Sequence, residues 1–218
     1  MMIDDKTALT IYLIRHAEAT NTIHKDIISG RTYDAELTKK GIMDSVSLGE
    51  KLLKDKVFFN TVYSSPIKRA QDTANIVSTI LSINTHDIIK TTSLEELDFG
   101  DWEGKLDKDI YTKEVLQSIK DQGDSFTPPN GESRLMVEQR VSSWFDNEIF
   151  KNTKFTSSKH TVAIFTHSFV INLLLHYILK FDNKIVYRID TNTSSITAIN
   201  YSKLGWRVMC INDISHLN

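Results

Sequence analysis

Residues 9–26, LTIYLIRHAEATNTIHKD, pass from an uncharged segment directly into an arginine and a histidine. Residues 9–14 carry no charge, which predicts a buried β-strand. Arg15 and His16 follow where that strand would end. Taken alone, an arginine and a histidine after a strand are more often structural or solvated than functional. Their meaning depends on which side chains the rest of the fold brings beside them.

Strand-like apolar runs alternate with helical patterns along the chain, which predicts an α/β sandwich with a largely parallel sheet. The predicted strands are residues 9–14, 58–63, 88–91 and 161–165, and residues 195–201 and 206–211 are predicted to form a hairpin. The predicted helices run from Thr38, as N-cap, to Leu53, from Ser64-Ser65-Pro66 onward with a serine as cap, near 133–149 and over 168–179. The second of these helices should carry an apolar stripe at helical spacing, formed by Ile67, Ala70, Ala74, Val77 and Leu81. We expect one domain over residues 1–218, because the helix after the loop at 123–133 needs the same core.

The ends of the predicted parallel strands collect polar side chains. Ligands of open α/β sheets bind beyond the carboxyl ends of the strands, so side chains that follow neighbouring strands should lie together. Two histidines, two arginines and a pair of glutamates follow the first four strands, namely Arg15, His16, Arg69, Glu95, Glu96 and His167.

This set of side chains suits phosphoryl transfer. Arginine presents a planar fork of donors that matches phosphate oxygens. A neutral histidine is a nucleophile, and neighbouring arginines would lower its pKa. A second histidine can donate a hydrogen bond to the transferred group, and a carboxyl group can act first as general acid and then as base. The arginine and histidine donors could supply the positive charge themselves, so we expect neither a metal nor a cofactor.

Composition excludes several other classes of protein. A net charge of −2 argues against a nucleic-acid-binding protein with a broad basic face. Neither a dinucleotide-binding loop nor a P-loop is present in the sequence. The single cysteine, Cys210, suits a reducing compartment, and the apolar run FVINLLLHYIL is too short to cross a bilayer. With no signal-peptide pattern at the start, we expect a cytoplasmic protein without a membrane partner, and its oligomeric state is left open.

Six blocks of the sequence resemble, in order, those of the histidine phosphatase superfamily, which includes the cofactor-dependent phosphoglycerate mutases. LIRHAEATN matches the family's Arg-His-Gly opening, and YSSPIKRAQDTA matches its Ser-Ser-Pro-x-x-Arg-Ala block. LEELDFGDWEGK and FTHSFVI resemble the blocks that carry the proton donor and the second histidine. DAELTKKG (34–41) and GESRLMVEQRV (131–141) match two supporting blocks. These blocks cover most of the chain.

The resemblance implies a three-layer α/β/α fold of the phosphoglycerate mutase type and a transient phosphohistidine on His16, at Nε2. It implies that Arg15, Arg69 and His167 bind the phosphoryl group. It also makes Glu96, rather than Glu95, the proton donor, because Glu96 is in register with Phe99-Gly100 of the family's block.

Four further positions depart from the family pattern or are ambiguous within it. The family places a polar side chain against the phosphate shortly after the first histidine, and either Asn21 or Thr22 could provide it here. Ala17 and Ser168 stand where the family often has glycine. Alanine at position 17 would be costly only if its backbone needed a positive φ. Ser168 could cap the following helix or add a hydroxyl to the pocket.

The resemblance favours a phosphatase that acts on a small phosphorylated metabolite. The block LDFGDWEG is similar to that of the phosphatase branch, and the segment 105–129 is short for the larger cover of a mutase. Residues 105–135 are the expected cover of the active site. Within the phosphatases, the broad-specificity and α-ribazole-phosphatase-like group is the most similar. The alternatives are a cofactor-dependent phosphoglycerate mutase and a non-catalytic phosphate-binding module.

Overall fold

The structure, a computed structural model, describes residues 9–152, 155 and 159–217. The described residues form a six-stranded sheet in the order β3-β2-β4-β1-β5-β6. Its strands are β1 (Leu9–Arg15), β2 (Thr61–Ser64), β3 (Ile89–Lys90), β4 (His160–Thr166), β5 (Ile196–Ser202) and β6 (Gly205–Asp213). The first four run parallel to one another, whereas β5 lies antiparallel to both β1 and β6. The mostly parallel sheet and the C-terminal hairpin are therefore confirmed.

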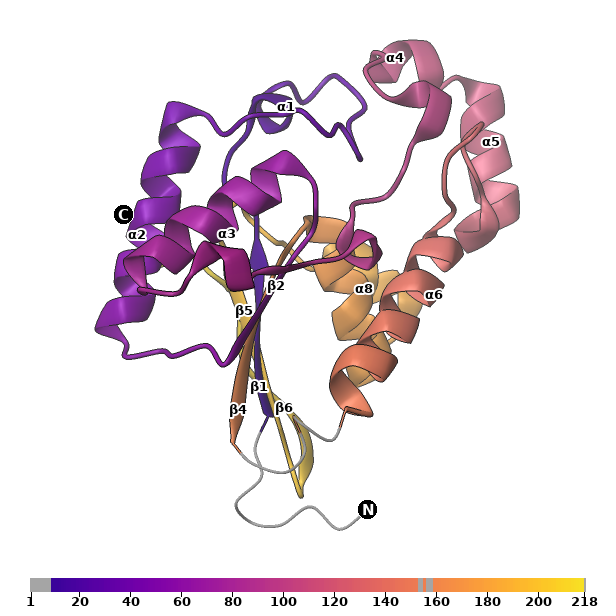
Figure 1. The fold of residues 1–218 in the computed structure, drawn as a ribbon. Coiled ribbons are helices and arrows are strands. Elements are labelled where there is room, and N and C mark those ends of the chain that lie inside the picture. Colours follow the sequence, from indigo (N-terminus) through magenta and orange to yellow (C-terminus); the bar gives the residue numbers. More distant parts are fainter. Residues whose placement is uncertain (1–8, 153–154, 156–158, 218) are drawn as a thin grey trace.

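Helices cover both faces of this sheet (Figure 1). The helices of the two layers are α2 (Lys39–Lys54) and α3 (Lys68–Ile80) on one face, and α6 (Arg134–Trp144) and α8 (Ser168–Leu179) on the other. Each layer encloses its own apolar core. Ile164 and Phe165 are neighbours in β4 and belong to opposite cores, because successive side chains of a strand point to opposite faces. Burial of these two cores holds the three layers together.

Three helices follow the sequence prediction closely. The Thr38 hydroxyl accepts a hydrogen bond from Gly41 N (3.0 Å) and caps α2 as predicted. α8 covers the predicted residues 168–179. The helix predicted near 133–149 is α6, which the Ser133 hydroxyl caps and which continues as a π-helix, η5 (Phe145–Phe150).

Two predicted strands are shorter in the structure. The strand predicted at 58–63 begins only at Thr61, and the Phe58 side chain before it is 77% exposed. The strand predicted at 88–91 retains two residues, Ile89–Lys90, at the edge of the sheet. These extents were wrong because apolar composition does not show which residues have a partner strand.

The start of the helix after Ser64-Ser65-Pro66 was also predicted wrongly. Its N-cap is Ile67, and α3 begins at Lys68, so neither serine is the cap. Ser65 instead places its Oγ 2.9 Å from Nε2 of His167. Four residues of the apolar stripe predicted for this helix are nevertheless fully inaccessible, including Ala70 and Ala74, whereas Leu81 is partly buried.

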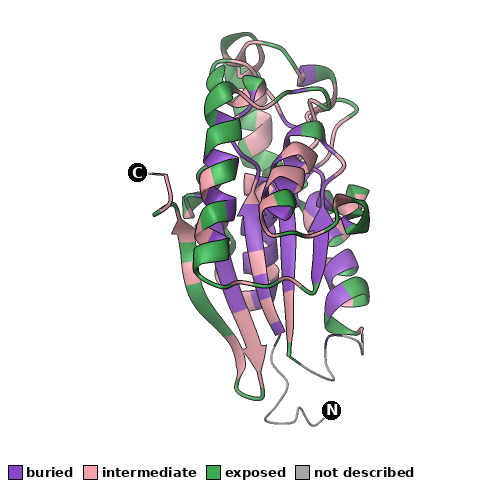
Figure 2. Cartoon of the chain, turned by 60° about the vertical axis from the view of Figure 1, so that its left-hand side comes forward, coloured by how far each residue is buried: buried purple, intermediate pink, exposed green. Residues whose placement is uncertain are grey.

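Short helices gather beyond the carboxyl ends of the parallel strands, at the top of Figure 1. They are α1 (Thr20–Ile23), α4 (Asp107–Ile110) and α5 (Lys113–Gln122), and neither α4 nor α5 contains a buried residue. Figure 2 shows the contrast between the buried strands and these more exposed segments. The 3₁₀ turns are η1 (Thr85–Asp87), η2 (Thr92–Leu94), η3 (Gly100–Trp102), η4 (Gly123–Ser125) and η6 (Asn183–Arg188). Among the helices of the described residues, none has the length and apolar character that crossing a lipid bilayer requires.

Candidate active site

His16 lies directly after β1, and only 2% of its surface is exposed. Its backbone N–H donates to the Thr166 carbonyl at the end of β4 (2.9 Å), which fixes the residue between two strand ends. Nδ1 lies 2.8 Å from the Ala17 carbonyl and therefore carries the ring proton, because a carbonyl can only accept. Nε2 is then unprotonated, and Arg69 Nε donates to it at 3.2 Å. The basic nitrogen of His16 thus faces a guanidinium group.

Arg69 lies in the first turn of α3 and is 1% exposed. Its terminal nitrogens donate to the carbonyls of Gly30 (2.7 Å) and Thr32 (2.8 Å), so the loop before α2 orients the guanidinium. Nη2 also lies 3.2 Å from Nδ1 of His167. Arg69 therefore connects the two histidines that the sequence analysis selected.

His167 and Arg15 complete the group around His16. His167 is the N-cap residue of α8, is fully buried, and its ring centroid lies 5.1 Å from that of His16. Its Nε2 meets Ser65 Oγ, so Nδ1 is the ring nitrogen on the side of Arg69. Arg15 is held by a hydrogen bond from Nη1 to the Thr191 carbonyl (2.5 Å). We call Arg15, His16, Arg69 and His167 the rim.

Burial and positive charge keep both rim histidines neutral. The pKa of His16 lies well below the usual value, chiefly because burial disfavours the imidazolium and secondly because Arg69 and Arg15 repel it. Burial and then Arg69 lower the pKa of His167 in the same way. The sequence analysis attributed the effect to the arginines, but desolvation is the larger cause. Burial also lowers the pKa of Arg69 to about 10, so this side chain remains charged near neutral pH.

Glu96 and Glu95 point to different places, although they are adjacent. The Glu96 carboxyl lines a cavity and accepts hydrogen bonds from the backbone N–H groups of Leu97 (3.0 Å) and Phe169 (3.4 Å). Burial raises the pKa of Glu96, although Arg69 and Arg15 act in the opposite direction. Glu95 is 3% exposed, and its carboxylate pairs with Arg31 (3.3 Å). Only Glu96 has the environment of a proton donor that opens onto a cavity.

Asn21 and Thr22 differ in what their side chains already bind. The Thr22 hydroxyl donates to the Ala19 carbonyl (2.8 Å) and accepts from the Ala19 N–H (2.9 Å), so it serves the local turn. Asn21 Nδ2 donates to Ser29 Oγ (2.8 Å), and Ser29 lines the cavity. Asn21 Oδ1 is buried and has no hydrogen-bond partner in the described part of the chain. This placement favours Asn21 over Thr22 as a residue that could contact a bound ligand.

The two residues that replace family glycines fit without strain. Ala17 is fully buried and does not have a positive φ, so its methyl group carries no backbone penalty. Its N–H donates to Thr73 Oγ1 (3.0 Å). Ser168 does not cap α8, because His167 occupies the N-cap position, and it lines the cavity instead.

The sequence analysis missed the part of the site formed by residues 29–32. Gly30 N donates to both carboxylate oxygens of Glu103 (2.9 and 3.0 Å), and Arg31 N donates to one of them (2.8 Å). This carboxylate fixes the loop whose carbonyls hold Arg69. A Cβ at Gly30 would come within 1.9 Å of the Leu97 carbonyl, so only glycine fits there. The sequence signal was Glu103 itself, within the quoted block LEELDFGDWEGK, but its partner lies 73 residues away.

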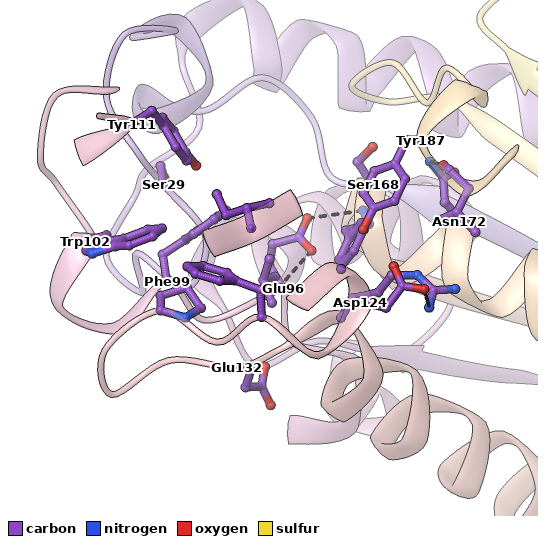
Figure 3. A pocket seen from close by; sticks show the side chains of 18 of the residues that line it. Ser29, Glu96, Phe99, Trp102, Tyr111, Asp124, Glu132, Ser168, Asn172 and Tyr187 are labelled. Carbon is purple, nitrogen blue, oxygen red and sulfur yellow. Dashed lines mark hydrogen bonds and ion pairs between the residues drawn. The ribbon is translucent and has the colours of Figure 1, made fainter. Parts of the chain in front are cut away.

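A cavity of about 540 Å³ opens beside Glu96 (Figure 3), and none of the four rim residues lines it. Residues of η3, α5, η4 and η6 line it, together with the starts of α6 and α8. In the described ranges, no group of three or more His, Cys, Asp or Glu side chains is arranged to hold a metal ion. The arrangement offers a neutral imidazole, two guanidinium groups and a carboxyl group beside a cavity, which suits the transfer of an anionic group from a bound alcohol.

The sequence model of the histidine phosphatase superfamily (branch 1) matches residues 11–214, which include the rim, Glu96 and the cavity. The chain belongs to this superfamily. The resemblance carried by the six sequence blocks is thereby confirmed.

Similar proteins of this superfamily include both mutases and phosphatases. A 2,3-bisphosphoglycerate-dependent phosphoglycerate mutase of Bartonella henselae is 31% identical over 142 residues, which are 64% of this chain and 68% of the mutase. "Putative phosphoserine phosphatase 2" of Hydrogenobacter thermophilus is 26% identical over 94% of this chain and 96% of its own length. The crystal structure of the α-ribazole phosphatase from Shigella flexneri has a TM-score of 0.79 at 22% identity, covering 94% of this chain and 96% of that one.

These comparisons confirm the predicted fold class, a phosphoglycerate mutase-like α/β sandwich. Membership of the histidine phosphatase superfamily, with a phosphatase-named relative that matches almost the whole chain, supports an enzyme of the phosphatase type. The superfamily acts on small phosphorylated substrates.

Proposed function

We propose that this protein hydrolyses phosphomonoesters without a metal ion, through a phosphohistidine intermediate on His16. The observation that carries the proposal is the state of His16: its Nδ1 proton is fixed on the Ala17 carbonyl, and its unprotonated Nε2 faces Arg69 beside the Glu96 cavity. A neutral imidazole held in this way is a nucleophile, and the guanidinium is placed to bind the group that it attacks.

In the first step, Nε2 of His16 attacks phosphorus, and the bond from phosphorus to the alcohol oxygen breaks. Glu96 gives its proton to the departing oxygen, and burial, which raises the pKa of Glu96, favours the protonated form that this step needs. In the second step, the Glu96 carboxylate takes a proton from water, and the resulting hydroxide attacks phosphorus. The N–P bond then breaks, inorganic phosphate is formed, and both side chains return to their initial states.

Arg15, Arg69 and His167 would bind the phosphoryl oxygens during both steps. The two arginines offset the charge of a phosphate dianion. His167 accepts from Arg69 at Nδ1 in this structure and uses Nε2 toward Ser65. It can donate to a phosphoryl oxygen through Nδ1 only after taking up a proton, which the negative charge of the phosphate would favour. Asn21 is the better placed of the two candidate residues for a further contact through its amide, and residues 105–135 would cover the substrate.

The test is hydrolysis of an aryl phosphate in the presence of EDTA. We expect wild-type protein to hydrolyse the ester and His16→Ala to lose activity by roughly 10⁴-fold or more. His86 is exposed, so the activity of His86→Ala should equal that of wild type. A rapid-quench experiment with ³²P-labelled substrate should show protein-bound phosphate that is stable in base and labile in acid, as an N–P bond requires. Undiminished turnover by His16→Ala would refute the phosphohistidine on His16.

A second candidate, phosphoglycerate mutase activity, rests on the 31% identical relative from Bartonella henselae. A mutase must keep its phosphohistidine from water, whereas a phosphatase must admit water. Incubation with 3-phosphoglycerate and 2,3-bisphosphoglycerate distinguishes them. Rapid formation of 2-phosphoglycerate, faster than release of inorganic phosphate, would favour the mutase.

A further inference from the structure

The cavity beside Glu96 is the place that the alcohol part of a substrate must occupy. Glu96 lines the cavity, whereas the four rim residues do not, so the carboxyl group separates the phosphoryl site from this space. A phosphomonoester with phosphorus at His16 and its bridging oxygen at Glu96 therefore extends its alcohol part into the cavity. The lining of the cavity then decides which alcohols fit.

Aromatic side chains form two opposite walls of this cavity. Trp102 stands on one side with Tyr111 and Phe126, at ring-centroid distances of 5.9 and 5.7 Å. Phe169 and Tyr187 pack against each other at 5.9 Å and stand on the other side. Figure 3 shows Trp102 and Tyr111 facing Tyr187 across the space above Glu96. Such walls favour a flat or bulky apolar group between them.

The amide and one carboxylate of the cavity lining are used within the protein. Asn172 Nδ2 donates to the carbonyls of Val186 (3.1 Å) and Ile189 (3.0 Å), and its Oδ1 accepts from Thr191 (2.9 Å). The Glu132 carboxylate forms ion pairs with Arg31 (2.8 Å) and with Arg140. These groups support the walls and are not available to a substrate, so the polar groups that remain for an alcohol are neutral hydroxyls such as those of Ser168, Tyr111 and Tyr187.

Arg134 is the one cation among the described residues that line the cavity, and its charge is already neutralised. Its side chain is 3% exposed and pairs with Asp124 (2.9 Å) and Glu138 (3.1 Å). Asn183 binds both Arg134 (3.3 Å) and Asp124 (3.2 Å), whereas Arg134 Nε is buried and has no hydrogen-bond partner among the described residues. A carboxylate or second phosphate on the substrate would therefore enter a cavity with no unpaired cation to receive it, and this is unfavourable.

We propose that this enzyme selects phosphomonoesters of neutral alcohols that carry an aromatic ring or a similarly large apolar group, and that the Asp124–Arg134–Glu138 cluster excludes substrates with a second anionic group. The inference rests on the proposed function, because it takes phosphoryl transfer at His16 as given. The proposed substrates differ from those that the relatives' names indicate, because phosphoglycerate and phosphoserine both carry a carboxylate.

Three synthetic esters with alkyl leaving groups test the proposal on wild-type protein: ethyl, benzyl and 4-carboxybenzyl phosphate. We expect the benzyl ester to have a kcat/KM about tenfold or more above that of the ethyl ester. Its kcat/KM should exceed that of the carboxybenzyl ester by a similar factor. Equal kcat/KM for the benzyl and ethyl esters would overturn the preference for a large apolar group. Equal kcat/KM for the benzyl and carboxybenzyl esters would overturn the exclusion of a second anionic group, which we call the charge part of the proposal.

Releasing Arg134 should relax the exclusion of anions. Asp124→Asn and Glu138→Gln each remove one negative partner, so each should raise the ratio of carboxybenzyl to benzyl kcat/KM by about fivefold. Asp121→Asn is the matched control, because Asp121 is exposed on α5 and does not line the cavity. An unchanged ratio in either variant, with circular dichroism like that of wild type, would overturn the role of the cluster. Should a variant fail to fold, the wild-type comparison of the three esters still decides the charge part.

Failure of the inference can be told from failure of the proposed function. Hydrolysis of all three esters at similar rates, abolished by His16→Ala, would refute the selectivity and leave the hydrolytic mechanism in place. Absence of hydrolysis and of protein-bound phosphate with every ester would refute the proposed function itself.

Discussion

The rim and the cover, residues 105–135, are built differently, and of the two regions the cover contributes the residues that line the cavity beside Glu96. At the rim, His16, Arg69 and His167 are at most 2% exposed, and their polar atoms are tied to strand ends or to the loop at 29–32. In the cover, α4 and α5 have no buried residues. The rim is thus fixed by the packing of the whole sheet, whereas the cover is attached by a few side chains such as Asp124. Under the proposed function, chemistry belongs to the first region and selectivity to the second.

Replacement of the adjacent glutamates is the strongest way to break this comparison. With ethyl phosphate, whose leaving group needs a proton, Glu96→Gln should lower kcat by roughly 10²- to 10⁴-fold. Glu95→Gln should change kcat by less than about tenfold, because the Glu95 carboxylate pairs with Arg31 and does not line the cavity. Steady-state kinetics of both variants provide the check. Equal losses would show that the assignment of the proton donor to Glu96 is wrong.

Two buried arginines, one from each region, provide the next comparison. Arg69→Ala should lower kcat/KM for ethyl phosphate by roughly 10²- to 10³-fold, because it removes donors from the phosphoryl group. Arg134→Ala should lower the same value by less than about tenfold, since Arg134 lies at the cavity wall. Circular dichroism must show that both variants fold. A larger loss for Arg134→Ala would remove the distinction between rim and cover.

The pH dependence offers a smaller and finer test. Because burial raises the pKa of Glu96, its proton persists to higher pH than on an ordinary carboxyl, and is lost as pH rises through that folded-state value. Hydrolysis of ethyl phosphate should then fall by about tenfold per pH unit on the basic side, whereas p-nitrophenyl phosphate, whose leaving group needs no proton, should fall less. Comparison of the two kcat profiles measures the effect. Glu96→Gln should make the profiles parallel, and parallel profiles in wild type would contradict the role of Glu96.

The acid side of the same profiles reports on His16. Its lowered pKa keeps the imidazole neutral below the ordinary value of 6.5, so activity should persist under mildly acidic conditions. The same shift affects stability: the unfolded chain takes up a proton near pH 6.5 and the folded one does not, so stability decreases as pH falls below that value.

Much of the fold followed from local patterns, and its errors have local reasons. Alternating strands and helices predicted the layers, and capping by Thr38 and the extent of α8 were predicted correctly. The strand at 58–63 was too long, because the Phe58 side chain is apolar yet lies outside the sheet. Ser65 was predicted as a possible helix cap, but its hydroxyl contacts the ring of His167, 102 residues away. Such a contact leaves no signal in the neighbouring sequence.

By itself, the sequence determined the type of chemistry. Arg15, His16, Arg69, Glu96 and His167 all occur in short blocks beside predicted strand ends, and parallel strands bring such ends to one edge. Only the tertiary structure decided which nitrogen of His16 is unprotonated and which glutamate faces the cavity. It also decided that the charge of Arg134 is neutralised by ion pairs. Each of these depends on hydrogen bonds or burial between distant segments. The sequence names the groups, and their protonation and accessibility arise only when the fold removes water and places their partners.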